Sequence, residues 1–232
     1  MKKIIQITDS HISKGKSYKN IATKKRLKNI VDNLAEDIAA VIFTGDLSHY
    51  GDDKSYKDIK KIIKKIAPIT YILAGNHDNL INLKKHFQKK MPSFFHLGEW
   101  QIIMLNSVKE NKTYGYLSDN ELKKLTNILA SDNAKYYLIA LHHPVVSMQS
   151  SWDDNESIRN PNDLFKIIAK YPKVKAIVWG HAHEAKEFQY NNIKLLSCPS
   201  SANQSVKDFN KTGYREISLY DNGQVLTNVI WM

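Results

Sequence analysis

Five short polar segments carry the residue types that bind metal ions in proteins. They are Asp9-Ser10-His11, Gly45-Asp46, Gly75-Asn76-His77-Asp78, His142-His143-Pro144 and Gly180-His181-Ala182-His183. Carboxylate oxygens, an amide oxygen and imidazole nitrogens together suit Mn²⁺, Fe²⁺/Fe³⁺ or Zn²⁺. The chain has one cysteine, Cys198, so a closed structural zinc site built on thiolates is disfavoured. Two metals about 3.5–4 Å apart could clamp the attacking and leaving oxygens of a phosphate ester and lower the pKa of a bound water.

Each segment taken alone has a plainer explanation. An aspartate after a strand is usually a turn former or a helix cap, and a single histidine is more often a surface or half-buried residue. Gly75-Asn76-His77-Asp78 alone could be a polar turn. The five segments together, each placed directly after an apolar run, favour one shared metal site over five unrelated turns.

The apolar runs before these segments predict the strands that position them. Strands are predicted at Lys3–Thr8, Ala39–Thr44 and Ile69–Leu73, and helices at Asn20–Glu36 and Ser55–Ile66. This β-α-β-α-β order indicates a largely parallel sheet covered by helices. Open α/β sheets place their ligands at the carboxyl ends of the strands, where the polar segments fall.

The second half of the chain first continues this alternation and then becomes strand-rich. Helices are expected at Leu80–Lys89, Asp119–Ser131 and Pro161–Lys170, with Ser118 and Glu121 forming a capping box. Strands are expected at Phe94–Leu97, Gln101–Asn106, Tyr136–Leu141, Val174–Trp179, Lys186–Tyr190, Ile193–Ser197, Arg215–Tyr220 and Val225–Ile230. Turn signals at Asn191-Asn192 and Asp221-Asn222-Gly223 predict that the last four strands form antiparallel hairpins. We expect residues 1–232 to form a single domain.

Composition limits the class of protein. The formal net charge is +11, but on the predicted helix Ser55–Ile66 the lysines lie opposite the apolar face, which favours a solvated surface over a nucleic-acid site. The apolar run at the N-terminus stops at Asp9, too early for a signal peptide, and no stretch is long enough to span a membrane. The expected location is cytoplasmic.

The five motifs in this order resemble those of the calcineurin-like metallophosphoesterases, and they extend from Asp9 to His183. The resemblance implies a four-layer αββα sandwich of two mixed β-sheets flanked by helices. It implies one metal held by Asp9, His11, Asp46 and His183, and a second held by Asp46, Asn76, His142 and His181. Asp46 would bridge the metals. The catalytic pair would be His77, as general acid or phosphate stabiliser, and Asp78, which would orient His77.

Within that superfamily the chain is most similar to the class III bacterial cyclic-nucleotide phosphodiesterases. Segments around Ser55-Tyr56, Ser151-Trp152 and Ser197–Ser201 carry this narrower resemblance. It implies hydrolysis of 3′,5′-cyclic nucleotides such as cyclic AMP to 5′-monophosphates by a metal-bridging hydroxide. The segment from Trp152 to Arg159 would form a flap, with Trp152, Arg159 and His143 as substrate-binding residues, although an ordinary surface loop is the alternative.

Two further interpretations stay open. The same metal site could act on another phosphodiester, such as nucleic acid, a nucleotide pyrophosphate or a 2′,3′-cyclic nucleotide, or on a phosphomonoester. A scaffold that has lost catalysis is disfavoured because every motif position is filled. The expected partner is a small anionic phosphodiester. No membrane partner is expected, nucleic acid is disfavoured since no aromatic-plus-basic stacking motif is present, and a homodimer is left open.

Overall fold

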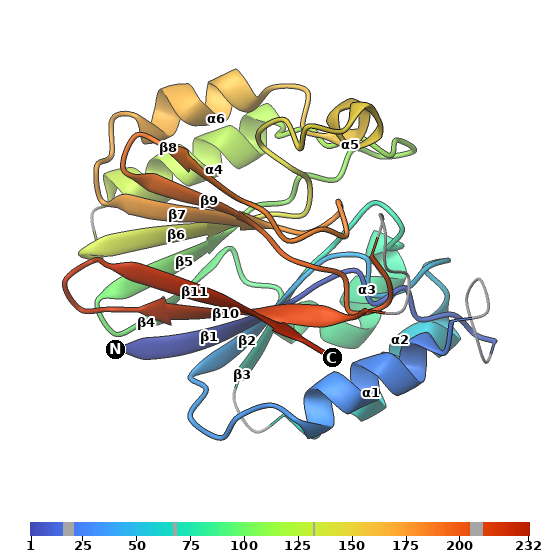
Figure 1. The fold of residues 1–232 in the computed structure, drawn as a ribbon. Helices are drawn as coiled ribbons and strands as arrows, with labels where there is room; N and C mark the ends of the chain where they lie inside the picture. Colours follow the sequence, from blue (N-terminus) through green and yellow to red (C-terminus); the bar gives the residue numbers. More distant parts are fainter. Residues whose placement is uncertain (16–20, 67–68, 132, 205–210) are drawn as a thin grey trace.

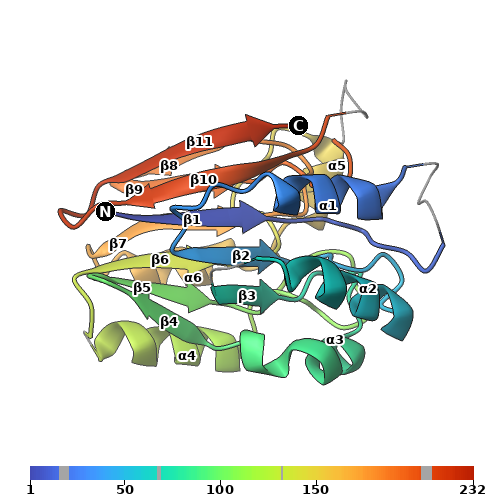
Figure 2. The ribbon, with the colours of Figure 1, turned by 90° about the horizontal axis from the view of Figure 1, so that it is seen from below.

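Two β-sheets packed face to face form the centre of the protein, with helices on both outer faces (Figures 1 and 2). The structure is a computed structural model that describes residues 1–15, 21–66, 69–131, 133–204 and 211–232. In Figure 1, helices α4 and α6 lie above the upper sheet, and α1 and α2 lie below the other. Helix α3 packs on the same face of that sheet as α1 and α2. The four-layer αββα sandwich expected from the sequence is confirmed.

The first sheet has the strand order β11-β10-β1-β2-β3. Its strands are β1 (Lys2–Ile7), β2 (Ala40–Thr44), β3 (Ile69–Leu73), β10 (Gly213–Leu219) and β11 (Val225–Trp231). Strands β1, β2 and β3 are parallel, and β10 pairs antiparallel with β1. The helices beside this sheet are α1 (Thr23–Asp32), α2 (Asp53–Ile63) and α3 (Leu80–Phe87), followed by the 3-10 turn η1 (Gln88–Lys90).

The second sheet has the order β4-β5-β6-β7-β9-β8. Its strands are β4 (Phe94–Leu97), β5 (Trp100–Met104), β6 (Tyr136–Ala140), β7 (Val174–Trp179), β8 (Glu187–Tyr190) and β9 (Ile193–Ser197). Strands β5, β6, β7 and β9 are parallel, and the edge strands β4 and β8 are antiparallel to their neighbours. Its helices are α4 (Asp119–Ala130), α5 (Ser151–Glu156) and α6 (Pro161–Ile168).

The central strands are apolar on both faces because each face is covered. In β2 every residue is buried: Val41 and Phe43 pack toward the helices, whereas Ala40 and Ile42 join the core between the sheets. This is the pattern expected for a parallel strand covered on both sides. Helix α2 buries Tyr56 and Ile59 and begins at the cap Asp52, whose carboxylate accepts a hydrogen bond from the backbone of Ser55.

Several local predictions need adjustment. Helix α1 is shorter than the predicted range 20–36, and Asn20 itself lies outside the described residues. The hairpins β8–β9 and β10–β11 are confirmed, but β9 also pairs in parallel with β7. Only half of the capping box is formed. The Ser118 hydroxyl accepts the backbone N–H of Glu121, but the Glu121 carboxylate accepts the backbone N–H of Asn106 and not that of Ser118.

Arg215 on β10 links the two sheets through a fully buried guanidinium group. Its Nε and Nη2 atoms donate to the backbone oxygen of Ser197 on β9 at 3.0 and 2.8 Å. Its Nη1 atom donates to Glu187 at 2.6 Å and to Thr227 at 2.7 Å. The C-terminal hairpin is therefore held against the second sheet by several charge-assisted hydrogen bonds.

We predict that Arg215→Ala lowers the free energy of unfolding by about 3 kcal/mol, since it removes a buried guanidinium group and leaves the buried carbonyl of Ser197 without two charge-assisted hydrogen bonds. Arg215→Lys should recover only part of this loss, because one ammonium group cannot reproduce the planar fork of donors. Urea denaturation followed by circular dichroism would measure both variants. A loss below about 1 kcal/mol for the alanine variant would show that Arg215 is not a main link between the sheets.

Candidate dinuclear metal site

The site lies where strands of both sheets end. Asp9 follows β1, Asp46 follows β2, Asn76 follows β3, His142 follows β6 and His181 follows β7. Figure 2 shows the arrows of β1, β2 and β3 side by side and pointing the same way, so the segments after them emerge at one edge. The structure thus brings together polar segments that are far apart in the sequence.

The backbone turns sharply as it leaves these strands. Five residues of the site adopt left-handed backbone conformations with φ between +43° and +68°: Asp9, His11, Asp46, His181 and His183. Such conformations are uncommon for residues other than glycine, and they cluster at functional sites. Close approach of the loops also requires Gly45, because a Cβ there would lie 2.3 Å from Nδ1 of His142. The segments are therefore packed tightly enough to fix their side chains.

The first donor group contains Asp9, His11, Asp46 and His183. The Nε2 atoms of His11 and His183 lie 3.0 Å apart, and Oδ1 of Asp9 lies 3.5 Å from Nε2 of His183. Oδ2 of Asp46 lies 3.7 Å from Nε2 of His11. These atoms surround one small volume, as the donors of a single ion would.

The second donor group contains Asp46, Asn76, His142 and His181. Oδ1 of Asn76 lies 3.1 Å from Nε2 of His142 and 3.0 Å from Nδ1 of His181. Oδ1 of Asp46 lies 3.5 Å from Nε2 of His142. Asp46 therefore turns one carboxylate oxygen toward each donor group.

The residues present fit two metal ions. Nδ1 of His142 bonds to the carbonyl of Thr44 at 2.7 Å, and Nδ1 of His183 bonds to the carbonyl of Asn203 at 2.9 Å. A ring that donates through Nδ1 presents the lone pair of Nε2, which is the usual arrangement of a metal-binding histidine. Oδ1 of Asp9 is buried and accepts no hydrogen bond from the described residues. A cation would satisfy that oxygen.

The electrostatics of the site also require positive charge. Burial raises the pKa of Asp9, but the nearby His183 and His142 outweigh it and lower that pKa to about 2. Burial alone would lower the pKa of His142, yet the Asp46 carboxylate raises it to about 9. Burial lowers the pKa of His11 and of His181 to about 3. Two ionised aspartates therefore face two neutral imidazoles, those of His11 and His181, while the aspartates raise the pKa of His142 and of His183. Metal ions would compete with the protons on those two rings.

His77 and Asp78 lie beside the second donor group, but Asp78 does not orient His77 as predicted. The backbone N–H of His77 donates to Oδ1 of Asp46 at 2.9 Å, and Nδ1 of its ring bonds to the carbonyl of His49 at 3.0 Å. The Asp78 carboxylate instead accepts from the backbone of Leu47, Ser48 and Gly75 and from the hydroxyl of Tyr56. Burial, reinforced by the charge of Asp46, raises the pKa of Asp78 to about 6.

The three expected substrate-binding residues take different positions. Trp152 lies on the short helix α5, where a flap or loop was expected, and its ring stacks on that of His181 with centroids 6.3 Å apart. Arg159 lies over the ring of Tyr114, 4.6 Å from its centroid. Both ring nitrogens of His143 are engaged, with Ser107 and with the carbonyl of Thr113. His143 and Trp152 both lie against His181, with ring centroids 4.8 and 6.3 Å apart, but His143 is fully buried whereas Trp152 has 63% of its surface exposed.

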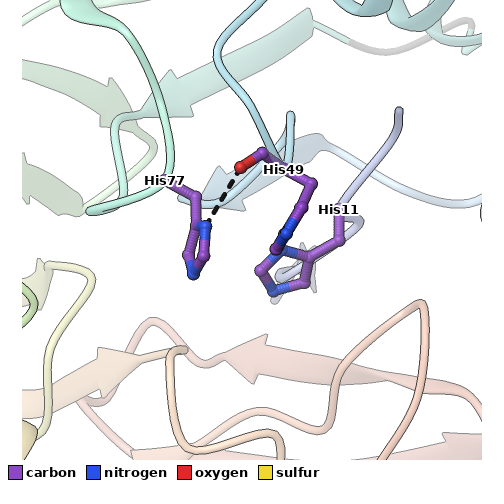
Figure 3. Close-up of side chains that lie close together, drawn as sticks. All are labelled: His11, His49 and His77. Atoms are coloured by element: carbon purple, nitrogen blue, oxygen red, sulfur yellow. Dashed lines mark hydrogen bonds between the residues drawn. The ribbon is translucent and has the colours of Figure 1, made fainter. Parts of the chain in front are cut away.

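His49 is a site residue that the sequence analysis missed. Its Nδ1 lies 3.2 Å from Nδ1 of His11, and its ring stacks on that of His77 with centroids 4.6 Å apart. Figure 3 shows the three rings together and the hydrogen bond from His77 to the carbonyl of His49. His49 therefore supports one residue of the first donor group and the residue beside the second. The one sequence feature that could have indicated His49 is its position three residues after Asp46, in the same strand-end segment.

Comparisons with known proteins agree with this geometry. The model of the calcineurin-like phosphoesterase family matches residues 2–185, so the chain belongs to that family of phosphate-ester hydrolases. It is 43% identical over 230 residues to a probable cyclic nucleotide phosphodiesterase of Vesicomyosocius okutanii, covering 99% of this chain and 98% of that protein. It is 33% identical over 248 residues to a 3′,5′-cyclic-nucleotide phosphodiesterase of Nostoc, covering 97% and 91%. The family and the histidine–aspartate groups together indicate a site for two metal ions.

A solved structure shares the fold. A dimetal phosphatase from Danio rerio superposes with a TM-score of 0.74 over 97% of this chain and 98% of that one, at 12% identity. At this identity the likeness supports the two-sheet architecture alone. No helix among the described residues is long and apolar enough to cross a membrane.

We predict different metal stoichiometries for two aspartate variants. Asp46→Ala should lower bound metal from about two ions per chain toward none, because each donor group loses a carboxylate oxygen. Asp9→Ala, the matched control, should lose about one ion, since the free oxygen of Asp9 faces His183 of the first group while its other oxygen accepts the backbone N–H of His181. Elemental analysis after dialysis against buffered metal would count the ions. Equal stoichiometry in the two variants would contradict the bridging position of Asp46.

Proposed function

We propose that the chain hydrolyses 3′,5′-cyclic nucleotides, with cyclic AMP as the leading substrate, to 5′-monophosphates. The observation that carries this proposal is a pair of donor groups sharing Asp46 in a chain that aligns along almost its whole length with proteins named cyclic-nucleotide phosphodiesterases. Mn²⁺, Fe²⁺/Fe³⁺ or Zn²⁺ fits a donor set of carboxylate, amide and imidazole. The cytoplasmic location stays a prediction of the sequence, and a homodimer stays open.

The residues of the chain would divide the work of the reaction. Asp9, His11, Asp46 and His183 would hold one metal ion, and Asp46, Asn76, His142 and His181 the other. Bound there, the ions would supply Lewis-acid activation of the phosphate and of water. A water oxygen adds to phosphorus and loses a proton, the bond from phosphorus to the 3′ oxygen breaks, and that oxygen takes up a proton, so that no net proton is gained or lost.

His77 is placed to supply that proton. Its backbone is held by Asp46 and its Nδ1 by the carbonyl of His49, so the ring is fixed and its Nε2 is the nitrogen left to exchange a proton with the leaving oxygen. The same protonated ring would balance negative charge on the phosphate. The excess of lysine gives the protein a positive electrostatic field, which attracts any anionic phosphate ester, including the other phosphodiesters left open by the sequence.

The proposal is tested by a panel of substrates. Metal-free protein supplemented with Mn²⁺ should hydrolyse 3′,5′-cyclic AMP to 5′-AMP in preference to 2′,3′-cyclic AMP, an aryl phosphodiester and single-stranded DNA. Product chromatography would separate 5′-AMP from 3′-AMP. If the protein hydrolysed the aryl diester but little of the cyclic nucleotide, it would still be a phosphodiesterase, but the proposed substrate would be wrong.

His77→Ala should lower kcat for the cyclic nucleotide by about 10²-fold or more, the usual scale for a positioned acid–base group, while the bound metal is unchanged. His96→Ala on the exposed edge strand β4 is the matched control, and it should leave turnover unchanged. Steady-state kinetics and elemental analysis of both variants would check this. Turnover by the His77 variant within about threefold of the unmodified protein would remove His77 from the mechanism.

A further inference from the structure

A pocket of about 760 Å³ opens beside Asn76 and His77. One side is formed by Asn79, Leu80 and Ile81 at the start of α3, and the other by residues 106 and 108–114. Its volume is in the usual range for a small-molecule site. It adjoins the second donor group at Asn76, so a phosphate held at the metals would leave the rest of its molecule beside this pocket.

The far wall of the pocket is a short hairpin, residues 107–116. Val108 and Gly115 form an antiparallel bridge, and the backbone N–H of Tyr116 donates to the carbonyl of Ser107 at 2.9 Å. The tip turns at Lys109–Lys112, where Asn111 has a φ of +57°. This hairpin therefore has its own hydrogen bonds and presents Tyr114 to the pocket.

Tyr114 is held from behind. The guanidinium group of Arg159 lies over the Tyr114 ring, and the backbone N–H of Arg159 donates to the carbonyl of Gly115 at 2.9 Å. The side chain of Asn160 both accepts from and donates to the backbone of Leu117, at 3.0 and 2.9 Å. A cation over one face of an aromatic ring both fixes that ring and leaves its other face for a ligand.

The chemistry of the lining suits a nucleobase. Tyr114 offers an aromatic face, and Ile81, with 80% of its surface exposed, offers an apolar one. Asn79, Asn106 and Asn111 line the same pocket. The amide oxygens of Asn79 and Asn106 accept backbone N–H groups of Asn82 and Val108, so these two side chains would offer their NH₂ groups to the polar edge of a base. Stacking on aromatic side chains together with polar edge contacts is the common way in which proteins bind unpaired bases.

We propose that this pocket binds the base of the substrate, with Tyr114 as the stacking platform and Arg159 as the positioning residue that fixes it. The inference rests on the proposed function, because it takes the substrate to be a nucleotide. It also reassigns Arg159, which was expected to touch base or phosphate and instead acts through Tyr114.

The test compares cyclic AMP with the 3′,5′-cyclic phosphate of methyl ribofuranoside, which lacks a base. Tyr114→Ala should lower kcat/KM for cyclic AMP by roughly 10- to 100-fold, mostly through KM, because one stacked base is lost. The base-free substrate should be hydrolysed equally by the variant and the unmodified protein. Tyr114→Phe should restore the preference for cyclic AMP.

Tyr116→Ala is the matched control. Tyr116 lies on the same hairpin and carries the ammonium group of Lys109 over its ring at 5.4 Å, but it does not line the pocket. Its substitution should leave the ratio of the two kcat/KM values unchanged. A change in this ratio as large as that of Tyr114→Ala would show that hairpin stability, rather than stacking, sets the preference, and would overturn the proposal.

Arg159 is tested by a double-mutant cycle. Arg159→Ala should raise KM for cyclic AMP in the unmodified background and have no further effect in the Tyr114→Ala background, while Arg159→Lys should retain part of the effect. Additive losses would mean that Arg159 acts independently of Tyr114 and would overturn its assignment.

Failure of this proposal is distinguishable from failure of the proposed function. If the unmodified protein hydrolyses cyclic AMP and Tyr114→Ala slows both substrates equally or neither, the pocket does not bind the base, although the protein is a cyclic-nucleotide phosphodiesterase. If the unmodified protein hydrolyses neither cyclic substrate, the proposed function fails and this inference fails with it.

Discussion

The Asp46 carboxylate is the interaction on which the rest of the site depends. One of its oxygens accepts the backbone N–H of His77 and faces His142, while the other faces His11. The backbone carbonyl of Asp46 also accepts the N–H of His11 at 2.9 Å. Burying this charge is costly unless cations and hydrogen bonds compensate for it. The surrounding histidines, and two metal ions where they bind, supply that compensation.

Such a crowded site needs scaffolding that does not itself touch the substrate. Asp78 provides much of it, because its carboxylate accepts from the loop after β2 at Leu47 and Ser48 and from the loop after β3 at Gly75. Tyr56 on α2 completes this set and also accepts the N–H of Asn79. The two strand-end loops that carry Asp46 and Asn76 are therefore fixed to one another. The last residue of the Gly-Asn-His-Asp motif positions its neighbours rather than the His77 ring.

Much of this arrangement could be predicted from local patterns. Apolar runs of strand length and amphipathic helices place Asp9, Asp46 and Asn76 at strand ends, and the topology of open α/β sheets brings those ends together. Contacts between distant segments could not be predicted in this way. The pairing of β9 with β7, the bond of Glu121 to Asn106 and the contact of Arg159 with Tyr114 depend on tertiary packing. His49 was missed because its contacts with the rings of His77 and His11 depend on tertiary packing, and its position three residues after Asp46 does not by itself predict them.

One buried hydroxyl connects the metal site with the pocket wall. Ser107, at the base of the hairpin, accepts the backbone N–H groups of His142 and His143 at 3.3 and 3.2 Å. Because Nε2 of His143 donates to the carbonyl of Thr113, Nδ1 of that ring must accept, so the Ser107 hydroxyl donates its proton to it. The end of β6 therefore fixes His142 of the second donor group and the hairpin that carries Tyr114 through the same few atoms. The distance between the metal site and the pocket is therefore fixed before a substrate binds. Such preorganisation lowers the entropic cost of placing the phosphate of the substrate for reaction.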